Sequence, residues 1–112
     1  MGYFLITAWN NGSYHKTGGG YGLRVSTINI KKYFNEKWKT VFIKLNGEKQ
    51  YINVNVNKKS FGDGKCGELI KKDIGKWLIK NNKVNWIKGC PPEFKMIHLT
   101  DNKFRVEFQK KI

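Results

Sequence analysis

The chain is dominated by short segments in which apolar and polar residues alternate, and this pattern most constrains its fold. Residues 50–57 (QYINVNVN) place Ile52, Val54 and Val56 on one side and asparagines on the other. Residues 103–109 (KFRVEFQ) repeat the pattern, with Phe and Val against Lys, Arg and Glu. A period of two is typical of strands with one buried face. Such segments must pair into a sheet whose apolar face is covered.

Turn signals separate the strand segments and predict hairpins. Asn46-Gly47 lies between the apolar segments 38–46 and 50–56, and Asn-Gly favours a tight turn between antiparallel strands. A second hairpin is predicted where Thr-Asp-Asn joins residues 94–99 to 103–109. Two further strands are expected at residues 3–9 and 21–26.

Two segments follow a helical pattern instead. Residues 26–34 offer Ser26 or Thr27 as the N-cap of a short helix. Residues 68–81 (ELIKKDIGKWLIKN) place apolar side chains on one face and lysines largely elsewhere, which predicts an amphipathic helix. Together these elements predict a single, mainly β domain covering residues 1–112: a small open barrel or pseudobarrel of about six to seven short strands with two helices. Parallel βαβ organisation is not expected, because too few strand–helix–strand units exist.

The charge of the chain restricts its partners. Twenty-two Lys and Arg residues against eight Asp and Glu give a net charge of +14 at pH 7. Abundant Lys, Asn and Ile indicate an AT-rich genome, which explains part of the lysine content. The same bias would also raise Glu, yet the chain has only five. The shortage of acids therefore indicates a polyanionic partner, with double-stranded DNA as the first candidate and RNA as an alternative.

The remaining composition argues against a membrane, a leader segment or a metal. No apolar run approaches the roughly 20 residues that span a bilayer, and the apolar side of residues 68–80 is needed for the core, so no membrane partner is expected. Residues 3–9 lack a preceding basic segment and a following cleavage site, so we expect a cytoplasmic protein. Cys66, Cys90, His15 and His98 match no zinc spacing, and we expect reduced thiols and no cofactor.

Two loops share a glycine-rich, basic composition. The first, in NNGSYHKTGGGYG, fails the phosphate-binding motifs, because Lys16 precedes the glycines and a strand follows them. An ordinary long hairpin loop is one interpretation, and a basic arm whose glycines let it follow a phosphate backbone is the other. If both loops leave the same end of the barrel, they would form two arms astride a duplex, with salt-dependent affinity. The candidate contacts are Ser13, His15, Lys16 and Thr17 in the first loop and Lys58, Lys59, Ser60 and Lys65 in the second.

Two alternative functions involve other residues. An RNA-cleaving enzyme or toxin would use His15 with His98, Lys16 and Arg24, although His98 lies in a predicted strand and no paired carboxylates suit a metal-dependent nuclease. A module for RNA or single strands would stack bases on exposed tyrosines and on Trp86, which lies near Lys88. Core packing is expected for the tryptophans at positions 9, 38 and 77. An adaptor for an acidic protein has no separate support.

The order of elements resembles a known family. Residues 31–56 (KKYFNEKWKTVFIKLNGEKQYINVNV) and 74–89 (IGKWLIKNNKVNWIKG) are similar to the helix-then-hairpin segment and the second helix of the DNA-binding pseudobarrel family. This family includes plant transcription-factor domains of the B-three type and effector domains of some restriction endonucleases. The resemblance implies a seven-stranded open barrel with a short helix at each end. It also implies that two arms, the loops after the first strand and after the hairpin, grip the major groove.

The resemblance assigns roles to the two loops. Ser13, His15, Lys16 and Thr17 would form one arm, with Arg24 at its base, and Lys58, Lys59, Ser60 and Lys65 would form the other. The chain departs from the family in its charge chemistry, because Lys greatly outnumbers Arg. Arg reads guanine through two hydrogen bonds, whereas Lys acts mainly as a point charge on phosphate. We therefore expect binding to the DNA backbone, with no clear expectation of sequence specificity.

Overall fold

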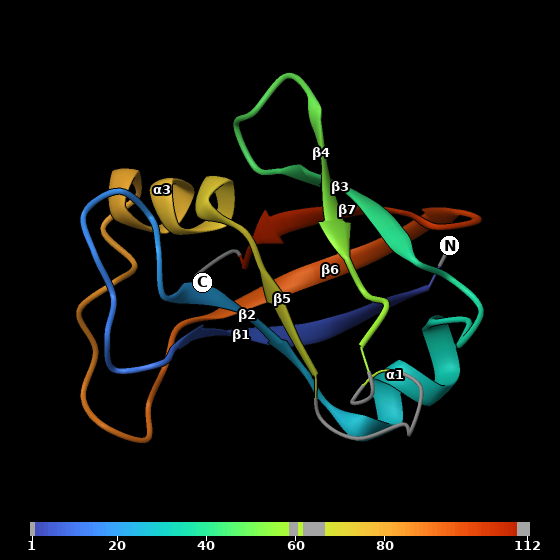
Figure 1. The fold of residues 1–112 in the computed structure, drawn as a ribbon, viewed down its shortest axis with the longest axis horizontal. Helices are drawn as coiled ribbons and strands as arrows, with labels where there is room; N and C mark the ends of the chain where they lie inside the picture. Colours follow the sequence, from blue (N-terminus) through green and yellow to red (C-terminus); the bar gives the residue numbers. More distant parts are fainter. Residues whose placement is uncertain (1, 59–60, 62–66, 110–112) are drawn as a thin grey trace.

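The computed structural model describes residues 2–58, 61 and 67–109, which form one strongly bent sheet with two helices (Figure 1). The strand order is β4-β3-β7-β6-β1-β2-β5, and every neighbouring pair is antiparallel except β3 and β7. The edge strands β4 and β5 come into contact, so the sheet closes into an open barrel. This architecture confirms the predicted mainly β fold. The strands are β1 (Tyr3–Asn10), β2 (Tyr21–Val25), β3 (Thr40–Leu45), β4 (Tyr51–Asn55), β5 (Gly67–Ile70), β6 (Glu93–Thr100) and β7 (Lys103–Phe108).

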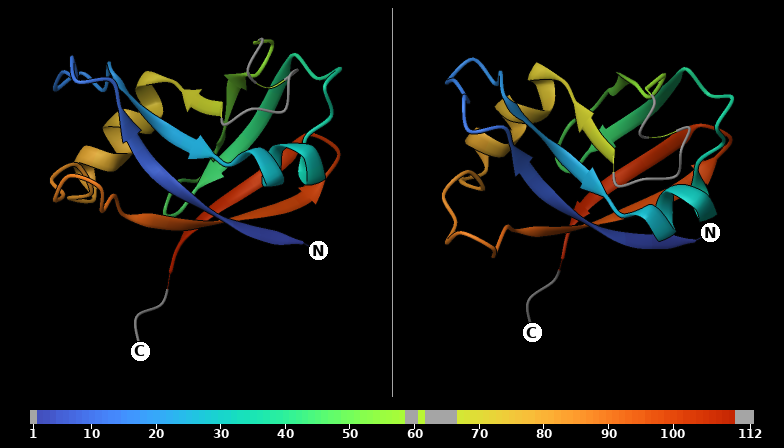
Figure 2. Two further views of the ribbon diagram at one scale, coloured as in Figure 1. Left: turned by 90° about the horizontal axis from the view of Figure 1, so that it is seen from below. Right: turned by 60° about the horizontal axis from the view of Figure 1, so that its bottom comes forward.

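The two helices, α1 (Thr27–Tyr33) and α3 (Lys72–Lys80), lie at opposite ends of the barrel (Figures 1 and 2). Helix α1 directly follows the end of β2, and the Ser26 hydroxyl accepts a hydrogen bond from the Asn29 N–H at 3.4 Å, as the predicted N-cap requires. Helix α3 follows Ile70, which pairs with Gly22 near the start of β2. Strand β2 therefore runs from the α3 end of the barrel to its α1 end.

The core fills the barrel with the inward side chains of all seven strands. Val54 and Val56 are buried and Ile52 packs half-buried against them, as the alternation predicted. Phe104 and Val106 of β7 are likewise fully buried. Trp77 of α3 stacks on Phe108 with parallel rings 5.3 Å apart. Burial of these large apolar side chains is the main stabilising contribution to a domain of this size.

The segment 67–70 differs from the prediction. It forms strand β5, and α3 begins only at Lys72, whereas the apolar pattern predicts a helix from residue 68. Leu69 is buried and Ile70 is 42% exposed, as expected for successive residues of a strand. The free edge of β2 takes up this segment as its partner, and the long-range pairing overrides the local helical periodicity.

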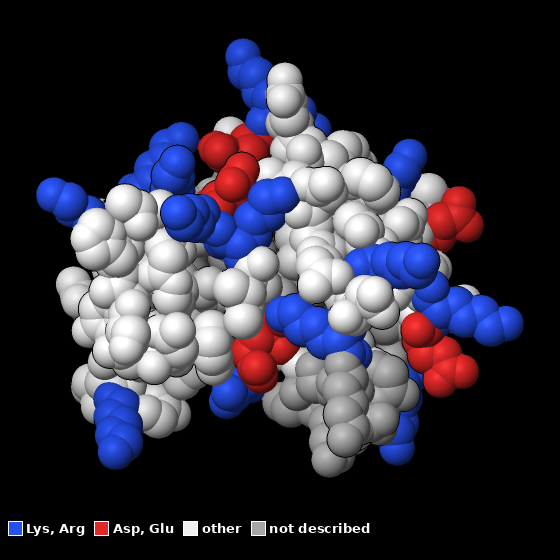
Figure 3. Space-filling view, in the orientation of Figure 1, with Lys and Arg blue, Asp and Glu red and all other residues white. Residues whose placement is uncertain are grey.

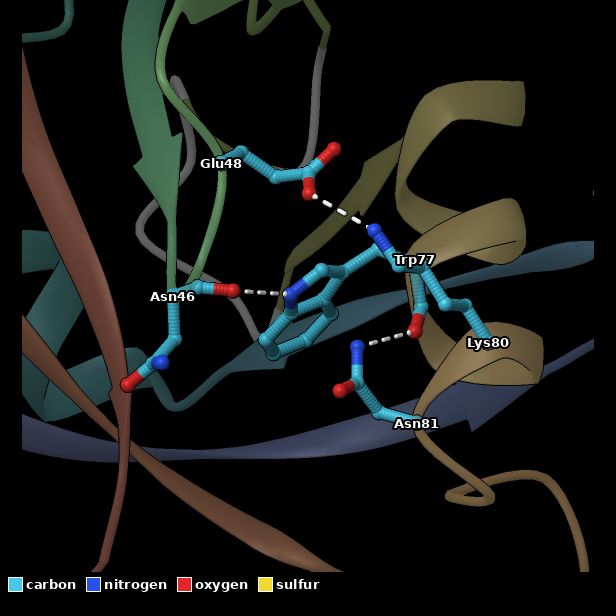
Figure 4. Close-up of polar contacts among 5 residues, drawn as sticks. All are labelled: Asn46, Glu48, Trp77, Lys80 and Asn81. Carbon is cyan, nitrogen blue, oxygen red and sulfur yellow. Dashed lines mark hydrogen bonds and ion pairs between the residues drawn. The ribbon is translucent and has the colours of Figure 1, made fainter.

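Polar contacts fix α3 to the turn between β3 and β4 (Figure 4). The indole N–H of Trp77 donates to the Asn46 carbonyl at 2.8 Å, and the Asn81 side chain donates to the Trp77 carbonyl at 2.8 Å. Lys80 and Glu48 form an ion pair at 3.4 Å. The side-chain oxygen of Asn46 also accepts the Phe108 N–H at 3.1 Å. Asn46 thus joins the predicted hairpin turn, α3 and β7.

Lysine side chains, instead of a strand ladder, connect the two edges where the barrel closes. We call the line between β4 and β5 the seam. Near the α1 end, Lys58 Nζ donates to the Glu68 carbonyl at 2.9 Å. Further along, Lys71 Nζ donates to the Asn53 carbonyl at 2.6 Å and to its side-chain oxygen at 2.5 Å. Part of the chain's positive charge therefore serves to close the fold.

Candidate nucleic-acid interface

The first loop, residues 11–20, is a folded extension of the β1–β2 hairpin, and we call it the glycine loop. The Asn11 N–H donates to Gly20 at 3.0 Å, the His15 N–H to Gly19 at 2.8 Å and the Gly18 N–H to His15 at 2.9 Å. Gly12, Gly18 and Gly20 all have φ between 83° and 96°, in the left-handed region that glycine adopts without a steric penalty. These bonds hold the loop in one shape.

The glycine loop is docked on α3 by direct contact between two backbones. A Cβ atom at Gly18 would overlap the Lys72 carbonyl, and one at Gly75 would overlap the Gly18 carbonyl. Both positions therefore require glycine for close approach, which explains a glycine in the middle of an amphipathic helix. The glycine composition of the loop is thus accounted for in part by its contact with α3.

The polar side chains of the glycine loop are exposed to solvent. Ser13, His15, Lys16 and Thr17 are all exposed. The Nδ1 atom of His15 accepts the Thr17 N–H at 3.2 Å and lies 3.1 Å from the Thr17 hydroxyl. Because an amide N–H can only donate, the proton of the neutral ring is on Nε2. Nε2–H is therefore the group that His15 presents as a donor.

Docking places the backbones of Lys72 and Lys76 against Gly18, two residues from Lys16, and the exposed acid Asp73 lies next to Lys72 on the same helix. Lys72 and Lys76 are exposed on α3, and the Gly18 position lies against the backbone of both residues. We call the combined surface of the glycine loop and these two lysines the loop–α3 surface. The sequence alone assigned Lys72 and Lys76 only to the solvent side of a helix. Gly75, which lies between them in the helix, is the feature of the sequence that could have indicated a close contact with another segment.

Arg24 and Lys58 meet at the other end of the seam, around Glu68. The Arg24 Nε–H donates to the Glu68 carboxylate at 3.2 Å, while Lys58 donates to the Glu68 main-chain oxygen. Partial burial lowers the pKa of the Lys58 ammonium, and the Glu68 carboxylate opposes that shift. The pair between Arg24 and Glu68 is partly exposed, so its contribution to stability is small. Both predicted contacts are therefore engaged within the protein.

The two loops attach at opposite ends of the barrel, so the condition for two arms astride one duplex, that both loops leave the same end, is not met. The glycine loop enters β2 at Tyr21, whereas the second loop enters β5 at Gly67, which pairs with Val25 at the far end of β2. Each loop leads into the first residue of a strand. Because β2 and β5 are antiparallel, their first residues lie at opposite ends of the barrel, and so do the two loops. Lys59, Ser60 and Lys65 lie outside the described residues.

One face of the molecule connects the two attachment points. It runs along β2, β5 and the seam, from the loop–α3 surface to Arg24 and Lys58. In the view of Figure 3, Lys and Arg side chains cross the middle of the molecule and surround its outline, whereas acidic side chains form small separate groups. Among the described residues, ion pairs form at Arg24–Glu68, Lys80–Glu48 and Arg105–Glu107.

Trp86 is not the exposed platform that the sequence suggested. Its ring is half-buried and packs against the core, whereas the adjacent Ile87 is 81% exposed and Lys88 is exposed. The segment turns this ring partly inward, so only part of its surface is open to a base. Trp77 is buried and Trp38 packs against the core, as expected, whereas Trp9 is half-buried outside the core cluster, because Ala8 takes the inward position of β1.

The residues considered for RNA cleavage do not come together. His98 lies at the α1 end, where its ring is 5.0 Å from Phe104 and its Nε2 is 2.6 Å from the Asp101 carbonyl oxygen. His15 lies at the α3 end on the glycine loop, so the two histidines cannot act as an acid–base pair on one substrate.

The described residues also contain few features of other site types. They hold no group of three or more His, Cys, Asp or Glu side chains placed to bind a metal ion. Cys90 is exposed as a free thiol, and Cys66 is outside the described residues. None of the helices in this part of the chain is long and apolar enough to cross a bilayer. Comparison with known proteins found no matching family model, no matching curated protein and no matching solved structure.

Proposed function

We propose that this chain is a non-enzymatic, double-stranded DNA-binding domain that acts in the cytoplasm. The observation that carries the proposal is the loop–α3 surface, where the glycine loop is docked on the backbone of α3 and exposed lysines lie on both sides of the contact, in an acid-poor chain of charge +14. Because the backbone that carries these lysines is already in place, binding to a phosphate backbone need order only their side chains. The open barrel with a helix at each end is also the layout that the pseudobarrel resemblance implied, and it supports the same function.

The duplex would lie along the face that follows the seam. The loop–α3 surface would contact it at one end, and Arg24, which is exposed beside Glu68, would contact it at the other. At a rise of about 3.4 Å per base pair, the 33 Å length of the molecule covers about 10 base pairs. Because the free cations are lysines and Arg24 already pairs with Glu68, we propose contacts mainly to phosphates, with weak sequence preference.

A salt titration tests the proposal. The probe is a fluorescent DNA hairpin with a stem of about 12 base pairs, followed by anisotropy across salt, with single strands, RNA and heparin as competitors. The test variant is Lys16→Glu/Lys76→Glu. Its matched control is Lys32→Glu/Lys95→Glu, which makes the same charge change on α1 and β6, where no proposed contact lies. Two lost phosphate contacts should reduce the salt slope by about two and weaken binding by more than about tenfold at low salt.

The proposal fails in either of two ways. Heparin and RNA that compete as well as duplex DNA would show general polyanion binding. An equal loss in both double variants would show that net charge alone drives association and that the loop–α3 surface has no special role. A loss confined to Lys16→Glu/Lys76→Glu, with duplex the best competitor, is the expected result.

A further inference from the structure

The outer face of β4, β3 and β7 carries a second cluster of groups that the proposed duplex site does not use. We call it the aromatic–basic face. Alternation along each strand turns these side chains outward, away from the core. Its members are Tyr51, Asn53 and Asn55 of β4, Thr40, Phe42 and Lys44 of β3, and Lys103 and Arg105 of β7.

The strand register arranges these side chains in two rows. Tyr51 lies opposite Lys44, which lies opposite Arg105. Asn53 lies opposite Phe42, which lies opposite Lys103. Each row thus contains one aromatic ring and at least one cation. The two rings occupy diagonal positions on adjacent strands, where side chains are roughly 7 Å apart and within reach of one ligand.

The rings are accessible, and the strand positions around them are mostly basic. Two acids from outside the strands, Glu48 and Asp73, share a hollow with Tyr51. Tyr51 is 44% exposed and Phe42 is 37% exposed. Isolated exposed aromatics are common on protein surfaces, but here two lie together among cations. Among the outward positions of these strands, all of which the structure describes, Glu107 is the single acid, and it pairs with Arg105 at 2.6 Å. The face is therefore complementary to an anionic ligand with flat apolar groups.

We propose that the aromatic–basic face binds single-stranded nucleic acid, a role beyond the duplex binding proposed above. Bases would stack on Tyr51 and Phe42, while Lys44 and Lys103 contact phosphates. Stacking on aromatic side chains beside cations is how sequence-tolerant binders hold single strands, because every base offers a π face. A duplex hides the faces of its bases, so this site selects unpaired strands. The seam lies on the other side of β4, so duplex and single strand would bind side by side.

Anisotropy with fluorescent oligo-dT and oligo-U of about 10 nucleotides tests this site. Phe42→Ala and Tyr51→Ala should each weaken single-strand binding by about fivefold or more. Tyr51→Phe keeps the ring and should retain binding. Tyr3→Ala is the matched control, because Tyr3 is an exposed tyrosine on β1 and should leave binding unchanged. The ratio of the dT and U affinities shows whether DNA or RNA is preferred.

A second variant and a competition assay keep the inference open to refutation. Should Phe42→Ala unfold the domain, Phe42→Leu keeps the apolar volume, removes the ring and should show the same loss. Full affinity for the single strand in the ring-deleted variants, or displacement of the single strand by saturating DNA hairpin, overturns the inference. The variants at positions 42 and 51 should leave duplex affinity unchanged. If the unmodified protein binds single strands but does not bind duplex DNA, only the earlier proposal is disproved.

Discussion

The two ends of the seam use the same residue types for different purposes. At the α3 end, backbone contacts between Gly18 and α3 fix the glycine loop, and Lys16, Lys72 and Lys76 remain exposed. At the α1 end, Lys58 donates a hydrogen bond that helps to close the barrel, and Arg24 forms an ion pair with Glu68. Lysine content therefore does not measure the number of ligand contacts. Where backbone supplies the structural link, the charge remains available to a partner.

The largest expected effect tests whether docking organises the α3 end. Gly18→Ala introduces a Cβ that overlaps the Lys72 carbonyl, at a φ of +96° that disfavours any side chain. We expect a loss of about 3 kcal/mol of unfolding free energy, measured by urea denaturation, or a displaced loop with weaker duplex binding.

Gly12→Ala is the matched control for that substitution. Gly12 also has a positive φ, of +83°, but a Cβ there would meet nothing within 4 Å. It should cost only about 1 kcal/mol, the backbone penalty alone. Equal losses at the two glycines would show that the loop is not held by contact with α3.

The next largest effect distinguishes a lysine that stabilises the fold from a lysine that is exposed to a partner. Lys58→Met removes the hydrogen bond to the Glu68 carbonyl and should lower the unfolding free energy by about 1 kcal/mol, with little change in the salt slope of duplex binding. Lys16→Met should leave the unfolding free energy nearly unchanged and reduce the salt slope of duplex binding, because Lys16 is exposed on the glycine loop. A salt slope that falls equally in both variants would remove the distinction between the two ends.

The pH dependence of stability provides a second comparison of native protein and Lys58→Met. Burial lowers the pKa of Lys58 below its ordinary value of 10.5, so above the folded pKa the unfolded chain binds more protons. The unfolding free energy of the native protein should therefore rise relative to Lys58→Met as the pH approaches 10.5. Tyr21 acts in the opposite direction, since burial raises its pKa, but it is present in both proteins and cancels. If the difference in unfolding free energy between the two proteins stayed constant across this pH range, the lowered pKa of Lys58 would be contradicted.

The smallest effect concerns the pair at the α1 end. Glu68→Gln removes the carboxylate that offsets Arg24 and keeps the strand pairing of residue 68 with residue 24. An exposed pair contributes at most about 1 kcal/mol, so stability should change little, while duplex affinity should rise by about threefold. Anisotropy at low salt measures the gain. Unchanged affinity would place Arg24 outside the duplex contact.

The sequence predicted the local elements well and the long-range arrangement poorly. Alternation and the Asn46-Gly47 turn correctly gave the β3–β4 hairpin, and Ser26 gave the start of α1. Strand β5 was missed because Leu69 and Ile70 fit a helical face, and only the free edge of β2 makes them a strand. Nothing local placed the two loops at opposite ends or turned Trp86 inward. Each of those outcomes depends on pairing or packing with residues distant in the chain.

The parallel pairing of β3 with β7 has a consequence for how the domain forms. Ile43 pairs with Phe104 and Phe4 pairs with Met96, so both the β3–β4 hairpin and the β1–β2 hairpin attach to β6 and β7. The ribosome makes β6 and β7 after the other five strands. Contacts of such high sequence separation slow folding, because the loop between partners must close first. The barrel therefore cannot close until β6 and β7 have been made, and until then the apolar faces of both hairpins are exposed to chaperones and to aggregation.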